Sequence, residues 1–227
     1  MLSHFISVSI ICGPTLKFPR VRLVTTKIDS DAVLDYWLGS ARYQADAVTA
    51  AKQRWYKHGH RLDTPINNRF ADLLSQVSQD KSMEIHLPEV CAAKVIVLDQ
   101  FSRHIFRGSP AAWQNDSQAQ NLALAAVNSN HPHQLTPSEQ LFLWHPLHHS
   151  EDLPMQNLAI SLLKELLRSA SQPWQQALDG FLPGWQSHAA IITEFGRFPH
   201  RNNILGRVST KKELLYLSKK TSNYGQN

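Results

Sequence analysis

The sequence has few cysteines, no long apolar run and no glycine-rich loop, and each absence removes a class of protein. Its two cysteines, Cys12 and Cys91, stand far apart without metal-ligand spacing, so a disulfide framework is not expected. No apolar segment approaches the roughly 20 residues that cross a bilayer, so we expect no membrane partner. No phosphate loop or dinucleotide fingerprint occurs. These absences favour a soluble, cytoplasmic globular protein.

Acidic residues are missing from the first 28 positions, and this local absence explains the pI of 9.3. Residues 1–28 carry +4 of the total net charge of +5, which leaves 19 basic and 18 acidic residues in the rest. A nearly neutral remainder lacks the phosphate-neutralising surface of a nucleic-acid binder, so nucleic acid is not expected as a partner. We expect residues 1–28 to be a basic leader, either disordered or an over-extended start, and residues 221–227 to be a flexible tail.

Alternating β-branched runs and Asn-Gly hairpins are absent too, whereas helix starts recur along the chain. Thr136-Pro-Ser-Glu139 is typical of a capping box, and Leu158, Leu162 and Leu166 recur on one helical face. Caps, prolines and glycines predict helices over 30–38, 41–57, 64–79, 88–106 and 116–129, and further helices beginning near 136, 154, 173, 183 and 210. We therefore predict an all-α fold of about eight to ten helices in antiparallel pairs, forming one domain over residues 29–220.

Positive and aromatic side chains crowd together between residues 194 and 207. Arg197, His200 and Arg201 alternate there with phenylalanine, proline and glycine, and Arg207 follows shortly after. A solvated helix would space its charges out, so this composition indicates a partly enclosed wall in which each guanidinium needs an acceptor. That acceptor is either a protein carboxylate or an anionic ligand, and the sequence leaves both open.

A second polar group lies within the apolar segment 95–107. Asp99, Arg103 and Arg107 stand four residues apart and therefore follow one stripe of a helix whose other sides are apolar. Because such a helix is usually buried, we expect the stripe to face the interior or a cleft. An Asp99–Arg103 ion pair would brace the helix but would leave Arg107 over, so a structural role and a ligand-binding role remain equally open.

Histidines and carboxylates concentrate between residues 142 and 152. They are His145, His148, His149, Glu151 and Asp152. Imidazole and carboxylate suit zinc or iron, but Pro146 is expected to break the helical spacing, and no His-Glu-x-x-His pattern occurs. The alternative is a helix C-terminus where histidines complement the dipole. We favour that alternative and expect no metal or other cofactor.

Three blocks of the sequence are long and distinctive. They are Leu98-Asp-Gln-Phe-Ser-Arg-His-Ile-Phe-Arg-Gly108, His149-Ser-Glu-Asp152 and Phe195-Gly-Arg-Phe-Pro-His-Arg-Asn202. Together they resemble the mainly bacterial family known as domain of unknown function 924, and the likeness extends over about residues 31–217. It implies an all-helical fold similar to tetratricopeptide-repeat proteins, and it implies no reaction. His148 departs from the family pattern, which usually has glutamate there, and this removes a possible general base or metal ligand.

We predict that these segments form one cleft that binds a small anionic molecule, a carboxylate or phosphate compound, through guanidinium contacts. The residues predicted to line it are Asp99, Gln100, Arg103, Arg107, His149, Glu151, Arg197, His200, Arg201 and Arg207.

Two other classes of function remain open. One is an enzyme in which His149 or His200 acts as acid or base and arginines stabilise negative charge. A carboxylate, Glu151 or Asp99, would hold that histidine. The other is a scaffold for a peptide or protein, in which the arginine blocks are structural ion pairs. The sequence leaves open whether the chain is an enzyme and what its oligomeric state is.

Overall fold

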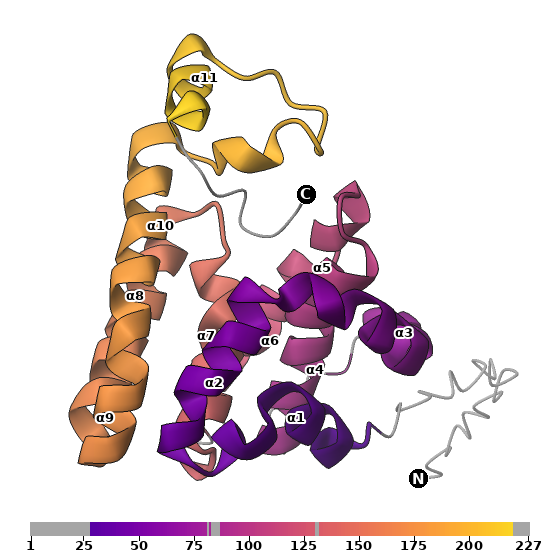
Figure 1. Ribbon diagram of the computed structural model, residues 1–227, viewed down its shortest axis with the longest axis vertical. Helices are drawn as coiled ribbons and strands as arrows, with labels where there is room; N and C mark the ends of the chain where they lie inside the picture. Colours follow the sequence, from indigo (N-terminus) through magenta and orange to yellow (C-terminus); the bar gives the residue numbers. More distant parts are fainter. Residues whose placement is uncertain (1–27, 81, 83–86, 130–131, 220–227) are drawn as a thin grey trace, which may run out of the picture.

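The computed structural model describes residues 28–80, 82, 87–129 and 132–219, and these residues form helices and turns without a strand (Figure 1). The all-α prediction is therefore confirmed. No helix in these ranges has the length and apolar character that crossing a membrane requires. The predicted tail and the predicted leader lie outside the described residues, apart from Ile28, whose side chain is buried in the core.

The helices follow one another with short connections. In chain order they are α1 (Ser30–Leu38), α2 (Val48–Lys52), α3 (Asp63–Gln79), α4 (Pro88–Ile96), α5 (Ser102–Ile105), α6 (Asp116–Val127), α7 (Pro137–His148), α8 (Leu153–Ser169), α9 (Gln172–Leu178), α10 (Leu182–Phe195) and α11 (Lys211–Ser218). Wider π-helical turns occupy Gln53–Lys57 and Val97–Phe101, and 3-10 turns include Gly39–Arg42, Pro132–Gln134 and Pro199–Arg201.

Side chains cap three of the helix starts that the sequence predicted. Asp29 accepts a hydrogen bond from the backbone N–H of Ala32, at 3.0 Å, and so caps α1. Capping boxes are complete at α7, between Thr136 and Glu139, and at α11, where Thr210 plays the same part. Each cap satisfies backbone N–H groups that have no partner inside the helix.

Two predicted helix boundaries are wrong. Residues 41–57 do not form one helix, because the chain extends at Gln44 and then resumes as α2 and a π-helical turn. No glycine or proline marks this break, which adjoins the buried contact of Arg42 with Glu139. Conversely, Pro146 does not interrupt α7, which continues to His148. Its missing N–H falls in the last turn, where only one helical hydrogen bond is lost.

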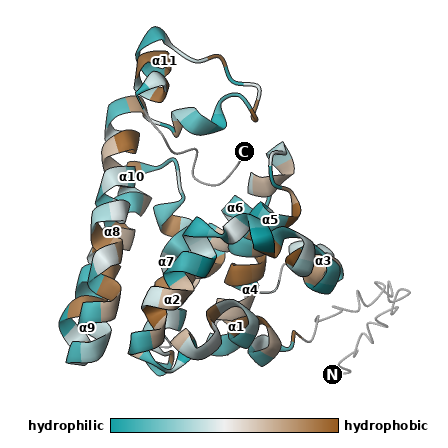
Figure 2. Ribbon diagram, in the orientation of Figure 1, coloured by the Kyte–Doolittle hydropathy of each residue, from teal (hydrophilic) through white to brown (hydrophobic). Residues whose placement is uncertain are grey.

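Helix α7 lies between two groups of helices. On one side it packs against α4 and α6, and on the other against α8, which runs beside α10 along one edge of the molecule (Figure 1). Figure 2 shows α4 as largely hydrophobic, in keeping with its packing against α1, α6 and α7. Trp37 anchors this core through ring contacts with Trp55, Phe101 and Phe142. The C-terminal end of α7 therefore meets segments from both halves of the chain.

A buried ion pair fastens the start of α7 to the segment after α1. The Arg42 guanidinium, 4% exposed, donates to Glu139 Oε1 at 2.6 Å and also to Asp31 and Asp35. Glu139 simultaneously accepts the Thr136 N–H that completes the capping box. One carboxylate thus serves helix initiation and inter-helix packing together.

We expect Glu139→Ala to lower the free energy of unfolding by about 3 kcal/mol, because it leaves a buried guanidinium without its enclosed partner and opens the α7 cap. Urea denaturation checks this. Glu165→Ala is the matched control, since Glu165 pairs with Arg168 on the exposed surface and should matter little. Equal losses in the two variants would contradict the role given to Glu139.

Candidate functional site

Polar side chains gather around a buried carboxylate beside the C-terminal end of α7. Asp99 is fully buried, and three side chains contact its carboxylate. His149 Nδ1 lies 2.9 Å from Oδ1, Arg103 Nη1 lies 2.9 Å from the same oxygen, and the Gln100 amide donates to Oδ2. The predicted Asp99–Arg103 contact is present, and the contact of His149 with Asp99 joins the end of α7 to the segment between α4 and α5.

A π-helical turn, Val97–Phe101, places this carboxylate. Such a turn adds one residue to the helical path and is common at functional sites. Its apolar members, Val97, Leu98 and Phe101, are completely buried and hold the turn in the core. A carboxylate in such surroundings is stable only when donors surround it, which the three contacts of Asp99 provide.

His149 is a neutral imidazole with one nitrogen available. Its Nδ1–H donates to Asp99, and no side chain or backbone group in the described ranges bonds to Nε2. Burial lowers the pKa of His149 well below 6.5, and the nearby charge of Arg103 lowers it further, which outweighs the attraction of Asp99 for a proton. The side chain is 17% exposed. Nε2 therefore presents a lone pair, which is the state of a general base.

Arg201 is the guanidinium with unused donors at this site. It is 8% exposed, yet its Nε–H reaches no acceptor among the described residues. Nη2 donates to the carbonyl of His149 at 3.0 Å, and Nη1 lies 3.9 Å from Asp116 Oδ2. Burial lowers the pKa of Arg201 to about 10, and repulsion from Arg103 contributes. Phe198 stacks beneath the guanidinium, with its ring centroid 4.4 Å away.

Asp116 connects the two arginines. Arg103 Nη2 lies 3.1 Å from Asp116 Oδ2, the oxygen that Arg201 approaches at the longer distance. Burial raises the pKa of Asp116, against the attraction of Arg103. Its other oxygen, Oδ1, is buried without a hydrogen-bond partner in the described part of the chain. Two guanidinium groups therefore share one carboxylate.

The other predicted arginines are each paired with a carboxylate through two hydrogen bonds. The pairs are Arg107–Asp63 at 2.6 and 2.8 Å, Arg197–Glu213 at 2.6 and 2.9 Å, and Arg207–Glu151 at 2.6 and 3.0 Å. The hydrogen bond from Arg197 lowers the pKa of Glu213 to about 2. Glu151 also accepts the backbone N–H of Phe198 at 2.8 Å. These contacts join segments that lie between 16 and 56 positions apart in the sequence.

The ten predicted residues thus fall into three groups. The structure brings together Asp99, Gln100, Arg103, His149 and Arg201. Glu151 and Arg207 lie beside this group through Phe198, and the ring of His200 packs on Phe198 at 5.4 Å. Arg107 and Arg197 contact other carboxylates, and no described contact joins them to His149.

Sequence reasoning missed Tyr56 and Asp116. Tyr56 is 57% exposed, but its hydroxyl turns inward and lies 3.2 Å from His145 Nε2. Burial of that hydroxyl raises its pKa, with a further contribution from Asp99. Trp55 and Tyr56 stand between the basic residues Arg54 and Lys57 in the sequence, and this combination could have drawn attention to the tyrosine. Asp116 appeared only as the polar start of α6, and nothing in the sequence linked it to Arg201.

The histidines near the end of α7 stack on aromatic rings. His148 lies against Trp185 at 4.9 Å and against His188 at 4.1 Å, with nearly parallel planes. His145 stacks on Phe142 at 4.4 Å. Within the residues that the structure describes, no three His, Cys, Asp or Glu side chains are arranged to hold a metal ion. These rings pack as aromatic groups.

Comparison with known proteins gives a family and a related fold. A family model described as "Bacterial protein of unknown function (DUF924)" matches residues 33–221. A solved structure of a protein of unknown function, ATU0120 from Agrobacterium tumefaciens, is 25% identical with a TM-score of 0.64. The match covers 84% of this chain and 97% of that one. No curated protein matches the chain. The resemblance to tetratricopeptide repeats stays a prediction.

The buried histidines predict loss of stability in acid. Burial lowers the pKa of His145 to about 4 and that of His148 well below 6.5. The unfolded chain binds these protons more readily than the folded protein, so the stabilisation is complete above about pH 6.5 and is lost as pH falls toward the folded pKa. His145 alone accounts for about 3 kcal/mol by pH 4.

Urea denaturation between pH 7.5 and 5 measures this effect. We expect the free energy of unfolding to fall across that range, and to fall less steeply in His148→Phe, which keeps the stacked ring but cannot be protonated. The control is His60→Gln, at an exposed position, which should leave the slope unchanged. An identical slope in His148→Phe and the wild type would refute the assignment.

Proposed function

This chain belongs to the bacterial family DUF924, whose function is unknown, and we propose that it binds a small anionic molecule, a carboxylate or phosphate compound, at Arg201. The observation that carries the proposal is the incomplete pairing of this guanidinium. A cation that is 8% exposed, with one N–H unused and its nearest carboxylate oxygen at 3.9 Å, is costly unless another acceptor completes it.

The surroundings of Arg201 suit an anion. Arg103 adds a second positive charge, and Asp116 is the carboxylate that both arginines approach. A planar guanidinium supported by Phe198 is held in a fixed orientation, which favours the two parallel hydrogen bonds that carboxylate and phosphate oxygens accept. That the anion binds in a cleft, as the sequence predicted, is part of this proposal.

The pairing of the other arginines reduces the set of residues that we propose to contact the ligand. Arg107, Arg197 and Arg207 each use two donors on an internal carboxylate, so we assign them to the stability of the fold. The ligand-binding group is therefore smaller than the ten residues predicted from the sequence. It is centred on Arg201, with Arg103 and His149 next to it.

We expect Arg201→Met to leave the melting temperature unchanged or slightly raised, because the substitution removes an incompletely paired buried charge. Arg107→Met is the matched control and should lower the melting temperature by about 5 °C, because it leaves Asp63 without its bidentate partner. Differential scanning calorimetry compares them.

The same variants test binding. Inorganic phosphate or succinate, added at constant ionic strength, should raise the melting temperature of the wild type and of Arg107→Met, since a ligand of the native state stabilises it. Arg201→Met should show no such rise. Equal rises in Arg201→Met and the wild type, or no rise in any form, would refute the proposal.

One observation favours a second candidate, an enzyme that uses His149 as general base. The contact of Nδ1 with Asp99 fixes the tautomer in which Nε2 carries the lone pair, and Arg201 bonds to the carbonyl of the same residue. In this candidate Asp99 orients the imidazole, His149 accepts a proton from the substrate, and Arg201 stabilises the negative charge that develops.

Nitrogen-15 NMR at pH 7 tests the protonation state that this mechanism needs. The spectrum should show His149 Nδ1 protonated and Nε2 bare, whereas Asp99→Asn should disturb that tautomer because the amide can donate in place of the carboxylate. Burial and the charge of Arg103 hold the pKa of His149 well below 6.5, so the neutral form is expected at pH 7. A doubly protonated His149 at that pH would rule out its role as a general base.

The third hypothesis, a scaffold for a peptide or protein, stays a prediction, as does a cytoplasmic location. The paired arginines fit a structural role, but they do so in the ligand-binding hypothesis as well. The scaffold hypothesis and the ligand-binding hypothesis differ only at Arg201, because a scaffold alone does not explain the incomplete pairing of its guanidinium.

A further inference from the structure

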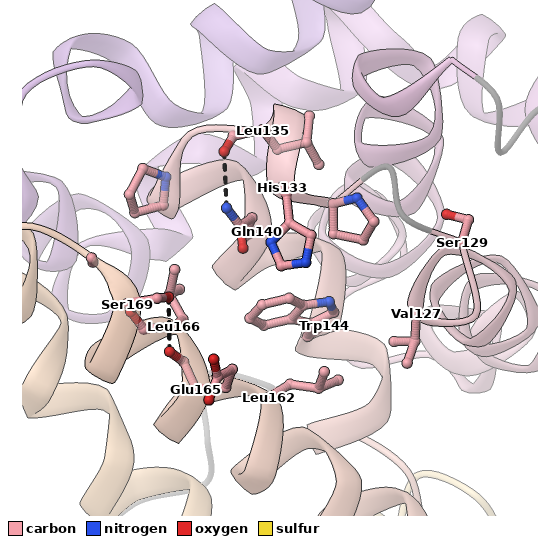
Figure 3. A pocket seen from close by; sticks show the side chains of 13 residues that line it. Val127, Ser129, His133, Leu135, Gln140, Trp144, Leu162, Glu165, Leu166 and Ser169 are labelled. Atoms are coloured by element: carbon pink, nitrogen blue, oxygen red, sulfur yellow. Dashed lines mark hydrogen bonds between the residues drawn. The ribbon is translucent and has the colours of Figure 1, made fainter.

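A pocket of about 340 Å³ lies on the other side of α7, away from the arginines. It is enclosed by the C-terminal ends of α6 and α8, the 3-10 turn Pro132–Gln134 and the first turns of α7 (Figure 3). Its volume falls within the range of small-molecule sites, about 300 to 1,000 Å³. None of the residues that line it belongs to the group around Arg201.

The walls of the pocket are mainly apolar. Leu162 and Leu166 stand one turn apart on α8, and Val127 and Leu135 approach from the opposite elements. The indole of Trp144 lies between His133 and Leu162 in Figure 3. A ligand here would therefore gain most of its affinity from apolar contact with flat and branched side chains.

The Trp144 side chain supplies a hydrogen-bond donor that is not used. Trp144 is 4% exposed, and its Nε1–H has no acceptor among the described residues. Figure 3 shows its nitrogen edge turned toward the side of the pocket where Val127 lies. By comparison, the indole of Trp55 donates to the carbonyl of Trp37 at 2.9 Å. The Trp37 indole also lacks an acceptor among the described residues, but it is enclosed in the core and does not line this pocket.

A buried donor without an acceptor costs about 1–3 kcal/mol, which an acceptor on a bound molecule would offset. The charges around the pocket indicate what kind of molecule that is. No lysine or arginine lines it in the described ranges, and Glu165, which does, is already paired with Arg168. An anion would meet the carboxylate of Glu165, and the imidazole of His133 is the one basic side chain among the described lining residues, so a neutral molecule fits best.

We propose that this pocket binds a small neutral molecule with a flat apolar body and one carbonyl-type acceptor, which receives the N–H of Trp144. The site is separate from the proposed anion site, although both are built on α7. Trp144 faces the pocket, while the next residue, His145, faces Phe142 and Tyr56.

Two ligands of similar shape test the acceptor. Acetophenone carries a carbonyl, and isopropylbenzene replaces it with a methyl-bearing carbon, so their affinities differ through polarity as well as hydrogen bonding. The informative quantity is the ratio of their dissociation constants, compared between the wild type and Trp144→Phe, which keeps an aromatic ring but removes the N–H. We expect the preference for acetophenone to drop about tenfold in the variant.

Proton–nitrogen NMR of the indole groups gives a second readout on the wild-type protein. Of the signals from the six tryptophans, the one missing in Trp144→Phe should move downfield with acetophenone and not with isopropylbenzene. Leu162→Trp, which fills the pocket, should abolish binding of both compounds and serves if Trp144→Phe does not fold. An unchanged ratio, no movement of the assigned signal, or undiminished binding in Leu162→Trp would overturn the proposal.

Discussion

Asp99 places a carboxylate in a part of the helical core that solvent does not reach, and the polar cluster is organised around satisfying it. His149, Arg103 and Gln100 all direct donors at this one side chain. Each of those donors is thereby fixed in orientation, and the π-helical turn that carries Asp99 is fixed with them. The arrangement links α7 to the segment between α4 and α5, so the stability of the core and the geometry of the polar cluster are not separable.

Acceptors determine which arginines are available for a ligand. Three arginines each hold one carboxylate through two donors, and removing one member of such a pair is costly where the other is buried. Arg201 differs because Arg103 already occupies the shared carboxylate of Asp116. Asp99 and Asp116 thus equal Arg103 and Arg201 in number, but the pairing is uneven, because Arg201 lies beside His149 without a carboxylate at hydrogen-bonding distance among the described residues.

The sequence predicted the helices with side-chain caps well, because capping is local: Asp29, Thr136 and Thr210 act within three residues. It also singled out Asp99, Arg103, His149 and Arg201, which the structure brings together, but it missed Asp116. It could not assign partners to the arginines, since Asp63 lies 44 positions from Arg107 and Glu151 lies 56 from Arg207. It misjudged residues 41–57 for the same reason, because a distant contact of Arg42 accompanies the break there.

The turn at Val97–Phe101 also makes the polar cluster sensitive to the length of the chain. A π-helical turn contains one residue more than the α-helical path would need, so losing one residue there would convert it into ordinary helix. Because the wide turn absorbs its extra residue, the side chains before and after it, Arg103 included, would keep nearly the same directions. The change would fall on the turn itself, which carries Asp99. A single-codon deletion there would disturb the buried carboxylate while preserving the helical bundle around it.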